Sequence, residues 1–157
     1  MRDKRFIAQH RGGGLGRNQH KELAKWALQC AENVLVLCDR VSAEQLKMIL
    51  DVGRNWIEGR VTAGDARKAS ITAISIARNS TEPTLTAAAR AAGHAVATAH
   101  MADHSVGAAL YALKAVKMAG KSVDAEREWQ NNMLTQSVRE MAIELRNIKE
   151  KSFRDLL

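Results

Sequence analysis

Apolar residues recur at three- and four-residue steps along most of the chain, which is the period of amphipathic α-helices. The first apolar stripe follows Asn18, a suitable N-cap, and extends to Cys38. The second begins at Ser42, whose spacing to Gln45 matches a capping box, and it stops at Gly59, a residue type that ends helices. These stripes predict two amphipathic helices.

The middle of the chain predicts further helices, separated by a proline and by a cluster of cap residues. Thr62 and Asp65 have capping-box spacing and open a third helix, which ends before Pro83. Helix-forming residues then continue over 84–120, a span longer than most globular helices. Because residues 102–105 include Asp and Ser, which favour caps, we expect a kink or break there.

The two ends of the chain differ in character. Residues 1–17 are basic and rich in glycine, so backbone entropy opposes regular structure and we expect a loop or arm. Near the other end, Ser122 is a suitable N-cap for a last long helix that extends to about Lys151. The sequence therefore predicts an amino-terminal arm, 1–17, and one all-α domain, 18–157, in which five or six helices form a compact bundle.

One segment has the composition of a central helix. Residues 87–100 are nearly all small, so other helices can approach this segment closely on several sides. Aromatic residues make up only 4% of the chain, so aliphatic side chains must fill most of the core. Trp26, Trp56 and Trp129 each lie on an apolar stripe and are interpreted as core anchors. We therefore expect an Ala/Gly-rich helix at the centre of the bundle.

Cysteine usage and hydropathy indicate a cellular compartment. Cys30 and Cys38 would lie about 12 Å apart on one helix, beyond the reach of a disulfide, and are expected to be reduced core thiols. No apolar run approaches the roughly twenty residues that span a bilayer, and no secretory leader pattern is present. A soluble, cytoplasmic protein without a cofactor and without membrane contact is expected.

The chain is basic, with 24 Lys and Arg against 17 Asp and Glu and a formal net charge of +7. This charge permits attraction to nucleic acid, anionic lipid or an acidic protein and does not select among them. The glycine-rich arm lacks the preceding strand and the Lys-Ser/Thr ending of a phosphate-binding loop. A basic nucleic-acid-binding helical module remains a third hypothesis, disfavoured because no interleaved aromatics or helix-turn-helix are visible.

The densest cluster of functional groups contains His94, His100, Asp103, His104 and Tyr111. On one regular helix, His100 and His104 would project about 40° apart, the spacing by which two imidazoles chelate a metal. A zinc protease motif would require Glu where Met101 stands, so that motif is incomplete. No complete catalytic set is present.

Two interpretations of this cluster remain open. The favoured one is that the histidines are hydrogen-bonded core or inter-helix residues. The alternative is a metal-binding protein or metal-dependent hydrolase that uses His100 and His104 with either Asp103 or His94. His94 would join such a site only if the helix were distorted, because on regular geometry it projects about 80° from His104.

Several segments resemble the bacterial helical family of putative immunity proteins, from the arm to about Leu134. They are FIAQHRGG at 6–13, HKELAKWA at 20–27, CAE at 30–32, GDAR at 64–67, AGHAVATAHMADHS at 92–105, AALYALKAV at 108–116 and EWQ at 128–130. The resemblance implies an all-α protein that neutralises a cognate bacterial toxin by stoichiometric binding and performs no catalysis of its own.

The resemblance also implies which residues and partners matter. We expect His94, His100, Asp103 and His104 to form a binding surface or a structural polar network, with Arg67 as an ion-pair partner and with Tyr111 beside them. The partner would be a toxin protein, and the apolar faces leave room for a homodimer. Inhibitors of nuclease toxins are commonly acidic, so the basic charge of this chain indicates that the toxin is acidic or non-nucleolytic, or that the role of the chain is different.

Overall fold

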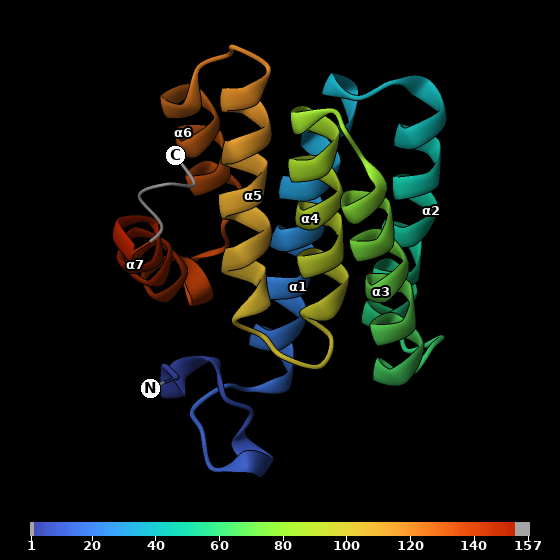
Figure 1. Cartoon of the computed structure of the whole chain (residues 1–157). Coiled ribbons are helices and arrows are strands. Elements are labelled where there is room, and N and C mark those ends of the chain that lie inside the picture. Colours follow the sequence, from blue (N-terminus) through green and yellow to red (C-terminus); the bar gives the residue numbers. More distant parts are fainter. Residues whose placement is uncertain (1, 153–157) are drawn as a thin grey trace.

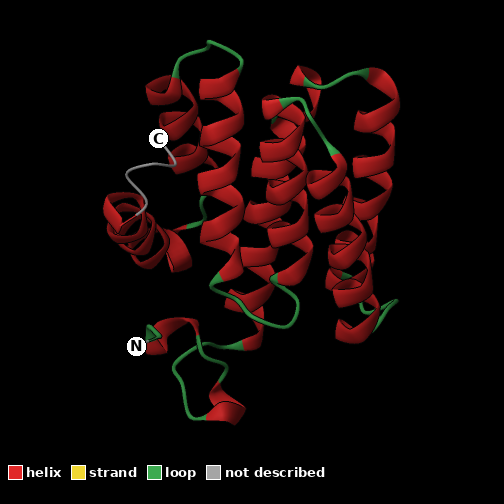
Figure 2. Cartoon of the chain, in the orientation of Figure 1, coloured by secondary structure: helices red, strands yellow, loops and turns green. Residues whose placement is uncertain are grey.

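The computed structural model describes residues 2–152, and this part of the chain is an all-α bundle (Figures 1 and 2). Its α-helices are α1 (Arg17–Asn33), α2 (Arg40–Ile57), α3 (Ala63–Asn79), α4 (Pro83–Ala97), α5 (His104–Met118), α6 (Val123–Met133) and α7 (Gln136–Ser152). Short 3₁₀ turns are η1 (Lys4–Phe6), η2 (Gln9–Arg11) and η3 (Leu35–Leu37). The predicted fold class is confirmed, with seven α-helices in the described part where five or six were predicted.

The first two helices have different ends from those predicted. Helix α1 ends at Asn33, and the chain then forms η3, so Cys38 is not on the same helix as Cys30. Asp39, and not Ser42, is the N-cap of α2, because the Asp39 carboxylate accepts a hydrogen bond from the Ser42 amide at 2.9 Å. Asx side chains are strong caps, and this one starts the helix three residues earlier than the Ser42–Gln45 pattern indicated.

The last predicted helix is two helices. Leu134 has extended backbone angles between α6 and α7 and its side chain is buried, so the chain turns at this position. Asn131 and Asn132 precede the turn, and asparagine has low helix propensity. The turn lets α7 pack against α1 and α5. Figure 1 shows α7 next to α5 at the red end of the chain.

The N-cap of α1 is Gly16 and not the predicted Asn18, and the Gly16 amide donates to Gln19 Oε1 at 3.2 Å. The predicted boundaries in the middle of the chain are confirmed. Thr62 and Asp65 form a capping box, in which the Asp65 amide donates to Thr62 Oγ1 at 3.1 Å and the Thr62 amide donates to Asp65 Oδ2 at 3.0 Å. Pro83 is the first residue of α4, where its missing N–H costs nothing. The chain also breaks as predicted, in a loop over residues 98–103 that separates α4 from α5.

Helix α4 is the centre of the bundle, as its small residues predict. It contacts α1, α2, α3 and α5, which surround it in Figure 1. Ala88, Ala91 and Ala92 are fully buried, and Gly93 lies so close to α3 that an added Cβ would meet Ala73 Cβ at 3.5 Å. Small side chains therefore permit close helix packing on several faces at once.

The amino-terminal arm is a folded loop that packs on the bundle. The side chains of Phe6 and Leu15 are buried, and the arm forms an isolated bridge between Ala8 and Leu15. An Arg5–Glu144 ion pair at 2.6 Å ties the arm to α7. Within residues 2–16 the segment contains no α-helix, as expected of a loop or arm, but it forms two 3₁₀ turns and contributes side chains to the core.

A buried polar network connects α6 and α7 with α1 and α5. The guanidinium of Arg146 is buried and donates from Nη1 to Gln130 Oε1 at 2.9 Å and from Nη2 to Asn131. Gln130 Nε2 donates to the Ala109 carbonyl at 2.9 Å, and Trp26 Nε1 donates to the Gln130 carbonyl at 2.9 Å. Burial lowers the pKa of Arg146, so these acceptors compensate the desolvation of its charge.

The tryptophans and cysteines mostly occupy the core, as predicted. Trp26 is fully buried, whereas Trp56 and Trp129 are half-buried and pack against the core. Both thiols are free, and burial raises the pKa of Cys30 far above its ordinary value and that of Cys38 to about 11. Within residues 2–152, no helix combines the length and the apolar character that a bilayer crossing requires.

Candidate functional site: the histidine cluster and the basic cleft

The loop between α4 and α5 brings the side chains of His94 and His104 together, although these residues belong to different helices. His94 lies in the last turn of α4 and His104 is the first residue of α5, and their Nδ1 atoms are 3.1 Å apart. One Nδ1–H therefore donates to the other Nδ1. The prediction that His100 and His104 share one helical face is wrong, because His100 lies in the loop, outside both helices.

The cluster continues along the face of α4 and α5. The ring of His94 stacks on Tyr111 with centroids 5.2 Å apart, and Arg90 Cζ lies 5.8 Å from the centroid of the Tyr111 ring. Gly107 makes this arrangement possible, since a Cβ there would stand 2.6 Å from His94 Nδ1. We call His94, His104, Tyr111 and Arg90 the histidine cluster.

Burial keeps the His94 and His104 imidazoles neutral at physiological pH. The pKa of His94 is lowered to about 4, mainly by burial and in part by the electrostatic influence of His104. Burial also lowers the pKa of His104, while the adjacent Asp103 carboxylate opposes the shift. Two neutral imidazoles form one hydrogen bond with each other, and the stacked tyrosine covers one of them.

Acidification is therefore expected to destabilise the fold. The unfolded chain binds a proton at His94 near its ordinary pKa of 6.5, and the folded chain binds it only near pH 4. The unfolded state thus holds more protons between these values, so stability is full above about pH 6.5 and decreases as the pH falls toward 4. Urea unfolding at about pH 7.5 and 4.5 should show a loss of roughly 2 kcal/mol.

The variant His94→Gln removes this titrating group and serves as the comparison. We expect its free energy of unfolding to depend less on pH over the same interval than that of the unsubstituted chain. An unsubstituted chain whose stability is equal at both pH values would contradict the neutral, buried assignment of His94.

His100 stands between the histidine cluster and a neighbouring cleft. Its ring centroid is 5.4 Å from that of His104, and its Nδ1 is buried without a hydrogen-bond partner among residues 2–152. Burial lowers the pKa of His100, and the positive charges of Arg67 and Arg11 lower it further. His100 therefore experiences a positive electrostatic potential.

The remaining predicted site residues have other partners. Asp103 pairs with Arg2 of the arm, with Nε and Oδ2 3.3 Å apart, and not with Arg67. Arg67 is exposed on α3 and acts on His100 only through its charge. Within the described residues, no group of three or more His, Cys, Asp or Glu side chains is placed to hold a metal ion.

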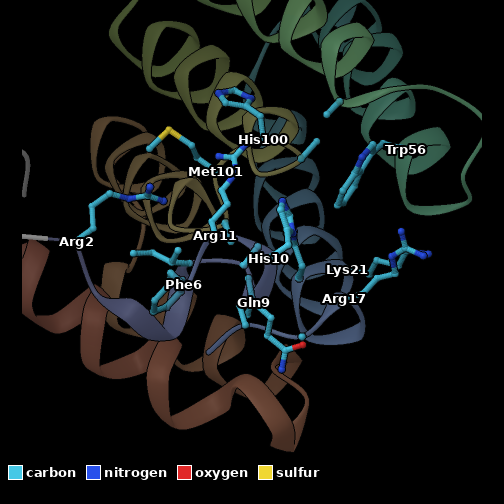
Figure 3. A pocket seen from close by; sticks show the side chains of 18 of the residues that line it. Arg2, Phe6, Gln9, His10, Arg11, Arg17, Lys21, Trp56, His100 and Met101 are labelled. Carbon is cyan, nitrogen blue, oxygen red and sulfur yellow. The ribbon is translucent and has the colours of Figure 1, made fainter. Parts of the chain in front are cut away.

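A cleft of about 730 Å³ opens between the arm, the start of α1 and the end of α2 (Figure 3). We call it the basic cleft and define it by Arg11, Arg17, His20, Lys21, Trp56 and His100. No Asp or Glu is among the described residues that line it. The α4–α5 loop lines the basic cleft and also joins His94 to His104, so the break between these helices shapes both sites.

His20 and Trp56 form one wall of the basic cleft, and sequence reasoning did not select His20. The two rings lie with centroids 5.0 Å apart, and His20 Nε2 lies 2.6 Å from the Thr98 carbonyl oxygen, to which it donates. Burial lowers the pKa of His20, and the charge of His10 contributes to the decrease. Only the packing of α1 against α2 and the α4–α5 loop brings these residues together.

Fold and site define a helical protein with a preformed, positively charged cleft. The chain belongs to the family described as Imm-5 like putative immunity protein, whose family model matches residues 14–137. The resemblance noted from the sequence is thereby confirmed. No curated protein and no solved structure matches the chain.

Proposed function

We propose that this chain neutralises a bacterial toxin by stoichiometric binding and that it performs no catalysis of its own. The observation that carries the proposal is the family match across residues 14–137. An inhibitor of this kind needs a rigid scaffold with a charge-complementary face and no chemistry. The partner is then a toxin protein, and the complex forms in the cytoplasm.

The geometry of the histidine cluster supports an architectural role for these side chains. His94 and His104 bond to each other, and His94 also stacks on Tyr111, so these polar groups satisfy one another. Asp103 and Arg2 hold the arm against the α4–α5 loop. In this proposal, the cluster fixes the loop, and the loop shapes the surface that meets the partner.

Co-expression tests the proposed function directly. We expect that the product of the neighbouring gene kills cells when expressed alone and that this chain restores growth. The variant His94→Gln should still protect, because its expected defect is in stability and not in the contact surface. Protection that is lost in a folded His94→Gln variant would contradict the architectural role, and a toxic neighbour that the unsubstituted chain does not neutralise would contradict the function.

Metal analysis separates this proposal from the metal-binding alternative. Protein purified without an affinity tag is expected to contain no stoichiometric zinc, iron or nickel, because two histidines of the cluster bond to each other. One equivalent of such a metal, lost in the variant His104→Gln, would instead favour a metal site built on His100 and His104.

A further inference from the structure

We propose that the basic cleft is the docking site for an acidic polypeptide segment of the partner toxin. This inference rests on the proposed function and names the surface and the chemistry of the contact. The proposal depends on a concave surface that combines several cationic side chains with a half-buried tryptophan on one wall and has no lining carboxylate.

The positive charge of the basic cleft is not compensated within the chain. Several other arginines have carboxylate partners, as in the pairs of Arg54 with Glu32 and of Arg127 with Glu150. Arg11 and Arg17 form no ion pair among residues 2–152, although both are exposed at the cleft. Unpaired arginines with free donor groups are suited to bidentate contacts with carboxylates of a partner.

The environment of His100 also has an excess of positive charge. Burial is the main cause that lowers the pKa of His100, and the charges of Arg67 and Arg11 lower this pKa as well. A carboxylate placed in the basic cleft would oppose the effect of these two arginines.

The shape of the cleft favours a polypeptide over a nucleic acid. Its volume of about 730 Å³ accommodates a few side chains, and Trp56 and Met101 add apolar surface beside the charges. Single-stranded nucleic acid is usually held by several aromatic platforms along a groove. Trp56 and Phe6 are the only aromatic residues other than histidine that line the described cleft, and Phe6 is 1% exposed.

The arm makes the cleft a preformed surface. Phe6 and Leu15 are buried under the loop, and the Arg5–Glu144 and Arg2–Asp103 pairs fix its two sides. Arg11 and Arg17, on either side of the glycine-rich turn, are thus presented by a folded backbone, as Figure 3 shows. Preorganisation lowers the entropic cost of binding.

The first experiment uses a fluorescein-labelled peptide of ten glutamates as the probe and measures binding by fluorescence anisotropy at low salt. The double variant R11E/R17E reverses the charge of the basic cleft at exposed positions. The matched control K47E/R139E makes the same change of net charge on exposed residues of α2 and α7 that do not line the cleft. Thermal unfolding should confirm that both variants fold.

We expect the cleft variant to bind the glutamate peptide about tenfold or more weakly, and the control to bind within about twofold of the unsubstituted chain. Equal losses in both variants would show that bulk charge drives binding and would overturn the proposal. So would unchanged binding by the cleft variant. Tighter, cleft-dependent binding of a single-stranded oligonucleotide of the same charge would overturn it in favour of a nucleic-acid ligand.

Co-expression with the toxin separates this inference from the proposed function. Protection that is lost in R11E/R17E and kept in K47E/R139E supports docking at the basic cleft. Protection by both variants would overturn the docking site and leave the immunity function intact. An unsubstituted chain that binds the peptide and fails to protect would contradict the immunity function and would remove the toxin as the occupant.

Discussion

Replacing Gln130 by Leu is expected to lower the free energy of unfolding by roughly 1.5–3 kcal/mol, the effect of removing a hydrogen-bond acceptor from a buried charged group. Leucine has nearly the volume of glutamine, so the packing changes little. The substitution removes the Oε1 acceptor of Arg146 and leaves a guanidinium that is 1% exposed with Asn131 as its remaining acceptor. The Trp26 bond persists because it ends on the Gln130 backbone carbonyl.

A double-mutant cycle isolates the role of the buried charge. Removing the charge as well, in Q130L/R146M, should recover part of the stability lost in Q130L, because no unpaired ion then remains in the core. Urea denaturation of the unsubstituted chain, the two single variants and the double variant gives the coupling energy. A Q130L variant that loses less than about 1 kcal/mol would show that Arg146 does not depend on this acceptor.

Replacing Gly13 by Ala is expected to detach the amino-terminal arm while the bundle stays folded. A Cβ on Gly13 would stand 2.0 Å from the Ile7 carbonyl oxygen, which is backbone and cannot move aside without opening the turn. The Leu15 amide, which donates to that oxygen at 3.0 Å, would lose its partner. Arm detachment is a local unfolding event, so cleavage by trypsin after Arg11 should accelerate by about tenfold or more.

The adjacent glycine provides a matched control. A Cβ on Gly14 would have the Lys4 carbonyl oxygen at 3.9 Å as its nearest contact, so Gly14→Ala should leave the cleavage rate nearly unchanged. Because the arm forms one side of the basic cleft, Gly13→Ala should also weaken binding of the glutamate peptide, and Gly14→Ala should not. Equal cleavage rates in the two variants would contradict the packing of the arm described here.

Sequence patterns predicted those helix ends that are determined by residues close together in the chain. The Thr62–Asp65 capping box and the position of Pro83 set the bounds of α3 and α4. The small residues of 87–100 identified the central helix, because only such residues allow close approach on several faces. The cap residues at 102–105 also located the break between α4 and α5.

The ends of α1 and of the carboxyl-terminal helices depend on tertiary contacts and were predicted less well. Asn33, the last residue of α1, donates to the Glu126 carboxylate of α6, a contact that spacing cannot show. Leu134 interrupts an otherwise continuous helical pattern because its side chain is buried at the turn. A pattern of period 3.6 does not distinguish one long helix from two helices joined by a buried residue.

For the candidate site, too, the sequence indicated candidate residues but not which of them are in contact in the folded chain. The cluster was located from His94 and His104, but their contact arises from the path of the α4–α5 loop and not from one helical face. The basic cleft assembles Arg11, His20 and Trp56 from three separate segments, and nothing in their spacing indicates that they meet. Net charge signalled a basic surface without giving its position.

A titration of toxin activity against the purified chain would show whether the chain acts as a stoichiometric inhibitor. Stoichiometric inhibition requires that activity falls linearly and reaches zero at about one equivalent, with a one-to-one complex in the same sample. Complete inactivation by a small fraction of an equivalent would reveal turnover and would exclude stoichiometric inhibition, as would full toxin activity in the presence of excess chain.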